Sequence, residues 1–216
     1  MKKIKSIVAI AAATAGLLGA ASSQAGVIFS DNFDADATAS VLNFNALINW
    51  TVDQGTVDYI RSGGFGIGCA GGTGGCIDTD GSTGDAGRLL SRQVFTFTSG
   101  VQYFIDMMLS GNQRNGSADS VDFGLVDVNT GALLGATVGP IAGNAPFGLV
   151  TGTFLGANAP GSYRLYVAGV GRDNVGAILD NFVLRDKTTT VPEPGTLALA
   201  AFALLGAVVA RRRRVA

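Results

Sequence analysis

The sequence predicts an all-β fold, an antiparallel sandwich of two sheets around one core, and three observations lead to this prediction. Short apolar runs recur along residues 26–190 in strand-like alternation with polar residues, and no convincing helical period interrupts them. Turn sequences separate the runs, among them Ser99-Gly100, Asn129-Thr130-Gly131 and Pro160-Gly161. This length suits one core and is too short for two ordinary domains. Many short strands without intervening helices favour a sandwich, and within that class a jelly roll.

The first element is a predicted signal peptide, residues 1–25. It begins with three lysines within the first five residues, and a charge-free run rich in Ala, Leu and Ile follows. Ser23-Gln24-Ala25 then places small residues at the minus-three and minus-one positions of a signal peptidase site. We therefore expect signal peptidase to cut after Ala25, whereas the alternative is a retained N-terminal anchor.

The β-sandwich domain is predicted over residues 26–187. The clearest strand is 101–109, where Val101, Tyr103, Ile105, Met107 and Leu109 share one face. The other expected strands lie within 27–33, 50–53, 56–60, 95–97, 121–125, 147–155, 163–167 and 177–185. These runs are short and turn-bounded, as expected for an antiparallel sandwich.

The segment 62–87 is different, because it is rich in glycine and predicts a long irregular loop. It contains the chain's two cysteines, Cys69 and Cys76. In an exported chain such a pair indicates a local disulfide, which would contribute about 2–3 kcal/mol to stability. A redox-active or metal-binding pair of cysteines would need a different spacing between the two residues in the sequence. Long ordered loops on a sandwich are common places for binding sites.

Charge and composition narrow the function. The whole chain has a formal net charge of −1, but residues 26–190 hold 15 Asp against 8 basic residues, a charge near −7. Such a domain is a poor nucleic-acid binder and suits polyols or divalent cations better. The chain has no His, which excludes Ser-His-Asp triads and His-ligated zinc. Paired Asp residues remain as the only route to glycosidase or lyase chemistry, so we expect no enzyme.

The loop 62–87 also carries a candidate calcium site. Asp78, Asp80 and Asp85 alternate with Gly, Ser and Thr, and hard cations bind several oxygens on such tightly turned backbone. The pattern is not an EF-hand, because the third acid and the closing Glu are missing. The alternative is an Asp/Gly-rich turn whose carboxylates accept hydrogen bonds from backbone N–H groups.

Asp180 lies in a strand that is apolar on both faces. It shares one face with Ile178, Phe182 and Leu184, so we expect its carboxylate to be at least half buried. A buried carboxylate must be paired, hydrogen-bonded or metal-bound. Hydrogen bonding to a neighbouring loop and metal binding both remain open.

Three aromatic residues are candidates for stacking on sugar rings: Trp50, Tyr59 and Tyr103. The alternative is that they belong to the core, as most aromatics at alternating positions do.

The C-terminal end predicts a membrane anchor. Residues 188–195 are predicted to form a linker and 196–210 a transmembrane helix, in which Leu197 to Ala210 is the apolar run. Arg211 to Arg214 begin a basic tail, 211–216. A helix over the apolar run would span roughly 21 Å, short of a ~30 Å bilayer core, and snorkelling arginines with local thinning could close the gap. By the positive-inside rule the arginines stay cytoplasmic.

Pro192, Glu193 and Pro194, followed by the apolar run and the terminal arginines, resemble the PEP-CTERM sorting signal of Gram-negative bacteria. The resemblance covers about the last 26 residues. It implies export across the inner membrane, a transient membrane anchor, and removal of this end by a membrane-embedded exosortase. It further implies a destination at the cell surface or in an extracellular matrix, in company with exopolysaccharide and biofilm.

The middle of the chain resembles the choice-of-anchor extracellular domains and the plant cell-wall domain-of-unknown-function 642 proteins, which are similar to galactose-binding-like jelly rolls. The matching segments are 50–52, 55–60, 77–82, 95–104, 110–112 and 179–183. The resemblance implies a carbohydrate-binding-module-like fold, and it makes Asn112 a further candidate for ligand binding. It also implies a structural calcium where the first and last strands meet, at Asp34 and Asp180. The glycine-rich insert 62–75 departs from the family pattern.

Together these features predict an exported, non-catalytic matrix or adhesion protein that binds polysaccharide. A purely structural, self-associating matrix protein without a sugar site is the alternative. A hydrolase or lyase using paired Asp is the third hypothesis.

Overall fold

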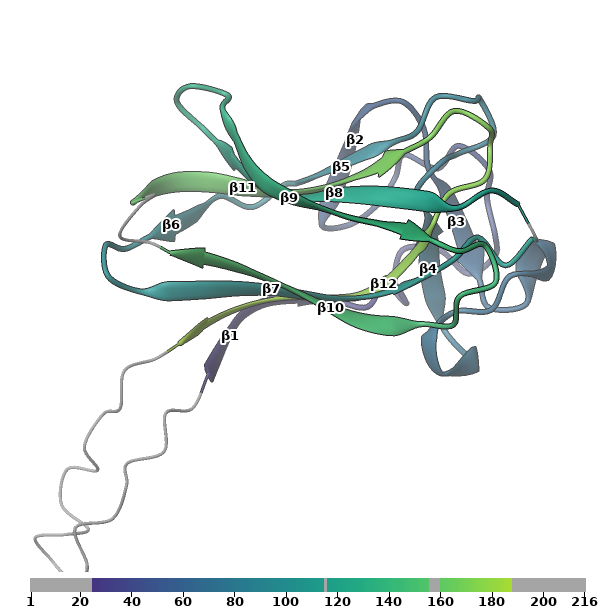
Figure 1. The fold of residues 1–216 in the computed structure, drawn as a ribbon, viewed down its shortest axis with the longest axis horizontal. Helices are drawn as coiled ribbons and strands as arrows, with labels where there is room; N and C mark the ends of the chain where they lie inside the picture. The colour runs from purple at the N-terminus through teal and green to yellow at the C-terminus, as the bar shows by residue number, and fades with distance from the viewer. Residues whose placement is uncertain (1–24, 115, 156–159, 188–216) are drawn as a thin grey trace, which may run out of the picture. The chain divides into compact units, whose positions relative to one another are not determined.

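The computed structural model describes residues 25–114, 116–155 and 160–187, and these form two antiparallel β-sheets packed face to face (Figure 1). This arrangement confirms the predicted sandwich. The predicted linker, transmembrane helix and basic tail lie outside the described residues, as does the predicted signal peptide apart from its last residue, Ala25, which begins β1. Among the residues that are described, no helix is long and apolar enough to span a membrane.

The first sheet contains six strands. They are β1 (Ala25–Asp31), β3 (Asp58–Arg61), β4 (Gly75–Asp78), β7 (Gln102–Ser110), β10 (Gly148–Leu155) and β12 (Ile178–Lys187). The strand order is β10-β7-β12-β4-β3, and β1 also pairs with β12. The last strand is therefore central, and the first strand lies beside it.

The second sheet also contains six strands. They are β2 (Trp50–Gln54), β5 (Arg88–Ser91), β6 (Phe95–Phe97), β8 (Asp119–Asp127), β9 (Leu133–Ile141) and β11 (Gly161–Val170). The order is β2-β5-β11-β8-β9, and β6 pairs with β11. Strands β9 and β10 are consecutive in sequence but are edge strands of different sheets.

The core lies between the sheets and is rich in aromatic residues. On β7 every second residue from Tyr103 to Leu109 is buried, as the alternation predicted. Trp50 is fully buried, and its ring meets Phe182 edge-on with centroids 5.0 Å apart. Burying each such side chain contributes about 1.5–3 kcal/mol. Residues Ala25–Lys187 form one compact unit that contains this core in full.

The structure corrects the predicted loop 62–87. Residues 75–78 form β4, which is buried throughout and pairs with β3 on one side and β12 on the other. A four-residue strand buried on both faces shows no alternation, so the sequence pattern could not reveal it. Strand β5 and the mostly exposed strand β9 were also missed.

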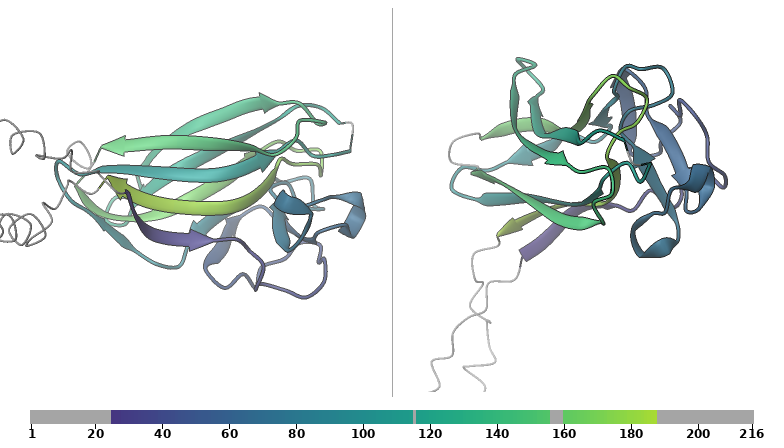
Figure 2. Two further views of the ribbon diagram at one scale, coloured as in Figure 1. Left: turned by 90° about the horizontal axis from the view of Figure 1, so that it is seen from below. Right: turned by 45° about the vertical axis from the view of Figure 1, so that its right-hand side comes forward.

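The two ends of the described chain lie together. Ala25 pairs with Lys187 at one end of the sandwich. Two short 3₁₀ turns, Gly64–Gly66 and Ala70–Gly72, lie at the opposite end (Figures 1 and 2). The glycine-rich loop is thus far from the point where the chain continues toward the sorting motif.

Candidate functional site

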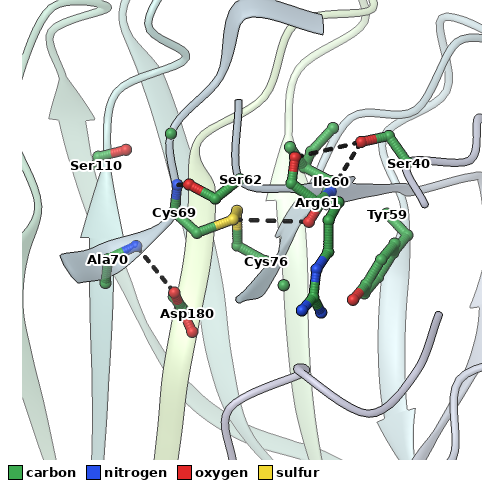
Figure 3. The surroundings of a disulfide bond; sticks show 12 residues. Ser40, Tyr59, Ile60, Arg61, Ser62, Cys69, Ala70, Cys76, Ser110 and Asp180 are labelled. Atoms are coloured by element: carbon green, nitrogen blue, oxygen red, sulfur yellow. Dashed lines mark hydrogen bonds between the residues drawn. A yellow bond between two sulfur atoms is a disulfide. The ribbon is translucent and has the colours of Figure 1, made fainter. Parts of the chain in front are cut away.

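The predicted disulfide between Cys69 and Cys76 is present, with Cα atoms 5.5 Å apart. It joins the glycine-rich loop to the buried strand β4. The backbone N–H of Ala70 donates to Asp180 Oδ2 (2.9 Å), and the N–H of Cys69 donates to Ser62 Oγ (3.1 Å) (Figure 3). The loop is therefore tied to β12 as well as to β4, which gives it a defined shape despite its glycines.

A hollow of about 360 Å³ opens beside this disulfide. Three segments form it: the glycine-rich loop, the turn after β7 and the β9–β10 connection. Its lining residues are Gly68, Cys69, Ser110, Gln113, Asn144, Ala145, Pro146 and Phe147. Small-molecule sites in proteins occupy about 300–1,000 Å³, so the hollow is large enough for a small ligand or a segment of polymer.

Gln113 holds two of these segments together. Its Nε2 donates to the Gly68 carbonyl (2.8 Å) and to Ser110 Oγ (3.1 Å), and its Oε1 accepts from the Gly68 N–H (2.9 Å). Below the loop, Phe147 packs against a small apolar cluster of Ile60, Ile67, Cys69, Cys76 and Ile178. The hollow therefore combines neutral amide groups with an aromatic side chain over an apolar base.

Phe65 is an exposed aromatic residue on the same glycine-rich loop. Its side chain is 52% exposed, and its backbone has a φ of 52°. A tight turn holds it there, since the Gly63 N–H donates to the Ile67 carbonyl (2.8 Å) and the Ile67 N–H donates to that of Gly64 (3.0 Å). A non-glycine residue in this left-handed region is strained by about 1–3 kcal/mol, and such positions cluster at functional sites.

The aromatic residues chosen from the sequence are core residues instead. Trp50 and Tyr59 are fully buried and Tyr103 is 5% exposed, so the prediction that they stack on sugar is wrong. The Trp50 indole N–H donates to Asp31 Oδ2, and the Tyr59 hydroxyl donates to the Ala37 carbonyl, both at 2.9 Å. The missed residue, Phe65, could have been found, because an aromatic surrounded by glycines has no strand in which to be buried.

Asn112 does not line the hollow, and the prediction that it binds ligand is also corrected. It is fully buried, and its Nδ2 donates to the Ser117 carbonyl (3.1 Å) and to Asp119 Oδ2 (2.9 Å). Its Oδ1 accepts from the Arg114 N–H (2.9 Å). Asn112 therefore shapes the turn that places its neighbour Gln113 in the hollow.

Two of the predicted calcium ligands belong to a buried acidic cluster. We use this name for Asp58, Asp78, Asp80 and Asp119, beside which Asp173 is exposed. Asp78 is fully buried, accepts from the N–H groups of Asp80 (3.1 Å) and Gly176 (2.9 Å), and forms an ion pair with Arg114 (2.9 Å). Asp80 Oδ2 accepts from the Asp173 N–H (3.2 Å). Its Oδ1 is buried and has no hydrogen-bond donor among the described residues.

Burial dominates the protonation of this cluster. It raises the pKa of Asp78 to about 7, although two backbone N–H groups and Arg114 act in the opposite direction. Burial likewise raises the pKa of Asp119 to about 6, with the charges of Asp173 and Asp80 adding to the effect. The pKa of Asp80 is raised for the same first reason. Asp78, Asp80 and Asp119 therefore bind protons more tightly than ordinary carboxylates do.

The remaining predicted calcium ligands are held by backbone donors. Asp34 Oδ1 accepts from the Gly75 N–H (2.7 Å), and Asp180 accepts from Ala70 and Asn181. Asp180 is 3% exposed, as expected, and burial raises its pKa to about 6, with Asp34 and Asp31 contributing. Asp85 is different, because it lies in a turn where its own backbone carbonyl accepts a hydrogen bond from the Thr56 N–H. Within the described residues, no three acidic or Cys side chains lie close enough to hold a metal ion together.

Comparisons with known proteins concern the two parts of the chain separately. Solved structures similar to this chain include a Clostridium thermocellum xylanase 10B with CBM22-1 and GH10 modules (16% identity, 76% of this chain and 29% of that chain, TM-score 0.46). Another is an endo-1,3-beta-glucanase from Streptomyces sioyaensis (13% identity, 79% of this chain and 99% of that chain, TM-score 0.45). A third is the CBM22-1 xylan-binding domain of Paenibacillus barcinonensis Xyn10C (13% identity, 78% of this chain and 99% of that chain, TM-score 0.39). The chain thus spans under a third of the xylanase.

No curated protein sequence matches this chain. Residues 190–214 match the family described as the PEP-CTERM protein-sorting motif, which confirms the motif predicted at Pro192, Glu193 and Pro194. The chain therefore carries a PEP-CTERM sorting motif behind an antiparallel β-sandwich, and this motif implies export and sorting by an exosortase.

Proposed function

We propose that this is a cell-surface or extracellular-matrix protein that binds polysaccharide without catalysis. The observation that carries the proposal is the neutral hollow beside the disulfide-tied loop. The glycine-rich loop that lines it lies at the end of the sandwich opposite the paired ends of β1 and β12 (Figure 1).

The chemistry of the hollow suits a sugar. A pyranose ring presents hydroxyl groups at its edges and C–H groups on its faces, so it needs neutral hydrogen-bonding groups beside an apolar surface. Asn144 supplies an exposed amide, and Phe147 supplies an aromatic side chain. Gln113 uses both of its amide N–H groups within the protein and holds two walls of the hollow together. Phe65, exposed on the same loop, offers a second ring for a longer polymer.

The same lining argues for binding without catalysis. Glycoside hydrolysis ordinarily uses two carboxyl groups on either side of the scissile bond. None of the residues described as lining the hollow carries a carboxylate. The carboxylates of Asp78 and Asp80 are buried and point to backbone N–H groups and Arg114, which is a structural use of charge.

The partners follow from this proposal. Signal peptidase and an exosortase would process the two ends, and residues 196–210 would hold the chain in the membrane before processing. The ligand would be the exopolysaccharide of the producing organism. The acidic domain makes nucleic acid an unsuitable partner, because counterion release needs basic residues.

A pull-down tests the proposal. Purified residues 25–187 would be mixed with the organism's insoluble exopolysaccharide, with calcium and with chelator, and the bound fraction measured. We expect binding, and a loss of about tenfold in Phe65→Ala, since aromatic contacts of this kind are worth on the order of 1 kcal/mol or more. Val128→Ala is the matched control, because Val128 is 47% exposed in the β8–β9 hairpin at the other end. A folded domain that binds no polysaccharide in either condition contradicts the proposal.

A further inference from the structure

One long segment of the domain contains no charged residue. Between Asp127 and Arg164 the sequence has 36 consecutive residues without Asp, Glu, Lys or Arg. All 15 Asp and 8 basic residues of the part between signal peptide and sorting motif lie elsewhere. In a domain of net charge near −7 this segment is the one long stretch that meets another copy without like-charge repulsion.

The uncharged segment forms the free edges of both sheets. Strand β9 pairs only with β8, and β10 pairs only with β7, within the described residues. Both edges lie on the same side of the sandwich (Figure 1). Natural edge strands usually carry charges or prolines that prevent pairing with other chains. Here β9 carries Pro140 near its end, and residues 133–138 have no such protection.

Strand β9 also extends beyond the opposite sheet. Phe123 and Leu125 of β8 are buried, yet their cross-strand partners on β9, Ala136 and Leu134, are exposed. The reason is that β10 lies opposite β8, since the Phe123 ring packs against Phe154 (6.4 Å between centroids). The Phe123 ring also lies so close to Gly152 of β10 that a Cβ atom at position 152 would clash with it. The core-facing side of β9 is therefore uncovered at Leu134, which is 42% exposed.

We propose that β9 pairs with β9 of a second copy of this chain, antiparallel across a two-fold axis. A strand paired antiparallel with its own copy is self-complementary in its backbone hydrogen bonds, and a two-fold interface requires such self-complementarity. The pairing brings together residues without charge and covers Leu133 and Leu134, which are 55% and 42% exposed. It joins the two second sheets into one continuous sheet. This inference is independent of the sugar site.

Sedimentation equilibrium of residues 25–187 over a range of concentrations tests the proposal. We expect a dimer that strengthens as salt is added, because salt screens the repulsion between two acidic copies. Leu134→Lys places a charge on the core-facing side of the edge, close to its own copy, and should weaken the dimer by about a hundredfold. Val170→Lys is the matched control, because it adds the same charge at a 49% exposed residue of the interior strand β11 and should leave the dimer intact.

Hydrogen exchange of the unmodified domain gives a second measurement that needs no variant. Amides of β9 should gain protection as concentration rises, while those of β2, an edge strand on the other side, should not. A domain that stays monomeric in high salt overturns the proposal. So does a dimer that Leu134→Lys leaves unchanged, and so does pairing of β9 only with a different protein. A monomer that still binds polysaccharide would leave the proposed function standing.

Discussion

The buried acidic cluster and the hollow both depend on the turn that follows β7, and they direct their polar groups differently. In the cluster, Asp78 receives hydrogen bonds from two backbone N–H groups and an ion pair from Arg114, all inside the protein. In the hollow, Gln113 uses three hydrogen bonds to fix the loop, and neighbouring Asn144 is exposed. Buried charge therefore organises this end of the sandwich, whereas the hollow leaves a neutral amide exposed.

The largest effect is expected from removing the centre of the acidic cluster. Asp78→Ala leaves two buried backbone N–H groups and the partly exposed Arg114 guanidinium without their acceptor, and each unsatisfied buried group costs about 1–3 kcal/mol. Urea denaturation measures this loss. Asp53→Ala is the control, since it removes the partly exposed ion pair with Arg88 and should cost about 1 kcal/mol or less. Equal losses in the two variants would contradict an organising role for the cluster.

Replacing both cysteines by serine separates the two regions. The free energy of unfolding should fall by about 2–3 kcal/mol, because the cross-link no longer restricts the unfolded chain. Polysaccharide binding should fall further than stability explains, since Gly68 and Cys69 line the hollow. Binding measured well below the melting temperature distinguishes these effects. Full affinity in the double variant would show that the loop needs no cross-link to hold the site.

The pH dependence of stability should reflect the acidic cluster. Burial raises the pKa of Asp78 to about 7, and those of Asp119 and Asp180 to about 6. The folded state therefore binds more protons than the unfolded state above the ordinary Asp pKa of 3.8, so these groups make stability fall as pH rises through about 6 to 7. Melting temperatures should drop from about pH 4 to about pH 7 and level off above that. A rise over this interval would contradict the assignment.

Arg114→Ala sharpens the same comparison. Arg114 lowers the pKa of both Asp78 and Asp119, so its removal should raise both values further and steepen the fall in stability with pH. Melting curves across the same pH interval measure the change. If the dependence of melting temperature on pH is unchanged in this variant, Arg114 does not influence the protonation of Asp78 and Asp119.

Calcium is expected to have the smallest effect, and it distinguishes two predicted places. The ion should raise the melting temperature of residues 25–187 through preferential binding to the folded state. Asp80→Asn should abolish the rise if calcium binds in the acidic cluster, where Asp80 Oδ1 has no described donor. Asp180→Asn should abolish it if calcium binds near Asp34. If calcium does not raise the melting temperature at all, both predicted calcium sites are contradicted.

Much of the fold could be predicted because it depends on local alternation. The face of β7, the burial of Asp180 and the disulfide all follow from patterns within ten residues of sequence, and each is present. The candidate site could be predicted only as a region. The glycine-rich loop was expected to carry a site, but its contact with the turn after β7, through Gly68 and Gln113, was not predicted, and Asn112 takes no part in it.

The choice of ligand-binding residues failed where alternation was the only guide. Trp50 and Tyr59 lie at alternating positions and are core residues, whereas Phe65 lies in a turn between glycines and is exposed. Alternation places side chains on one of two faces, but it does not say which face another sheet covers. That information comes from the packing of the two sheets.

The sandwich class, the disulfide, the acidic character of the domain and the sorting motif can all be derived from the sequence, because each rests on composition or on residues close together in the chain. The identity of the edge strands, the extension of β9 past β10 and the contact of Asp78 with Arg114 became known from the folded structure alone. These depend on the order of strands in each sheet. Sheet order arises from contacts between residues far apart in sequence, and no local pattern specifies it.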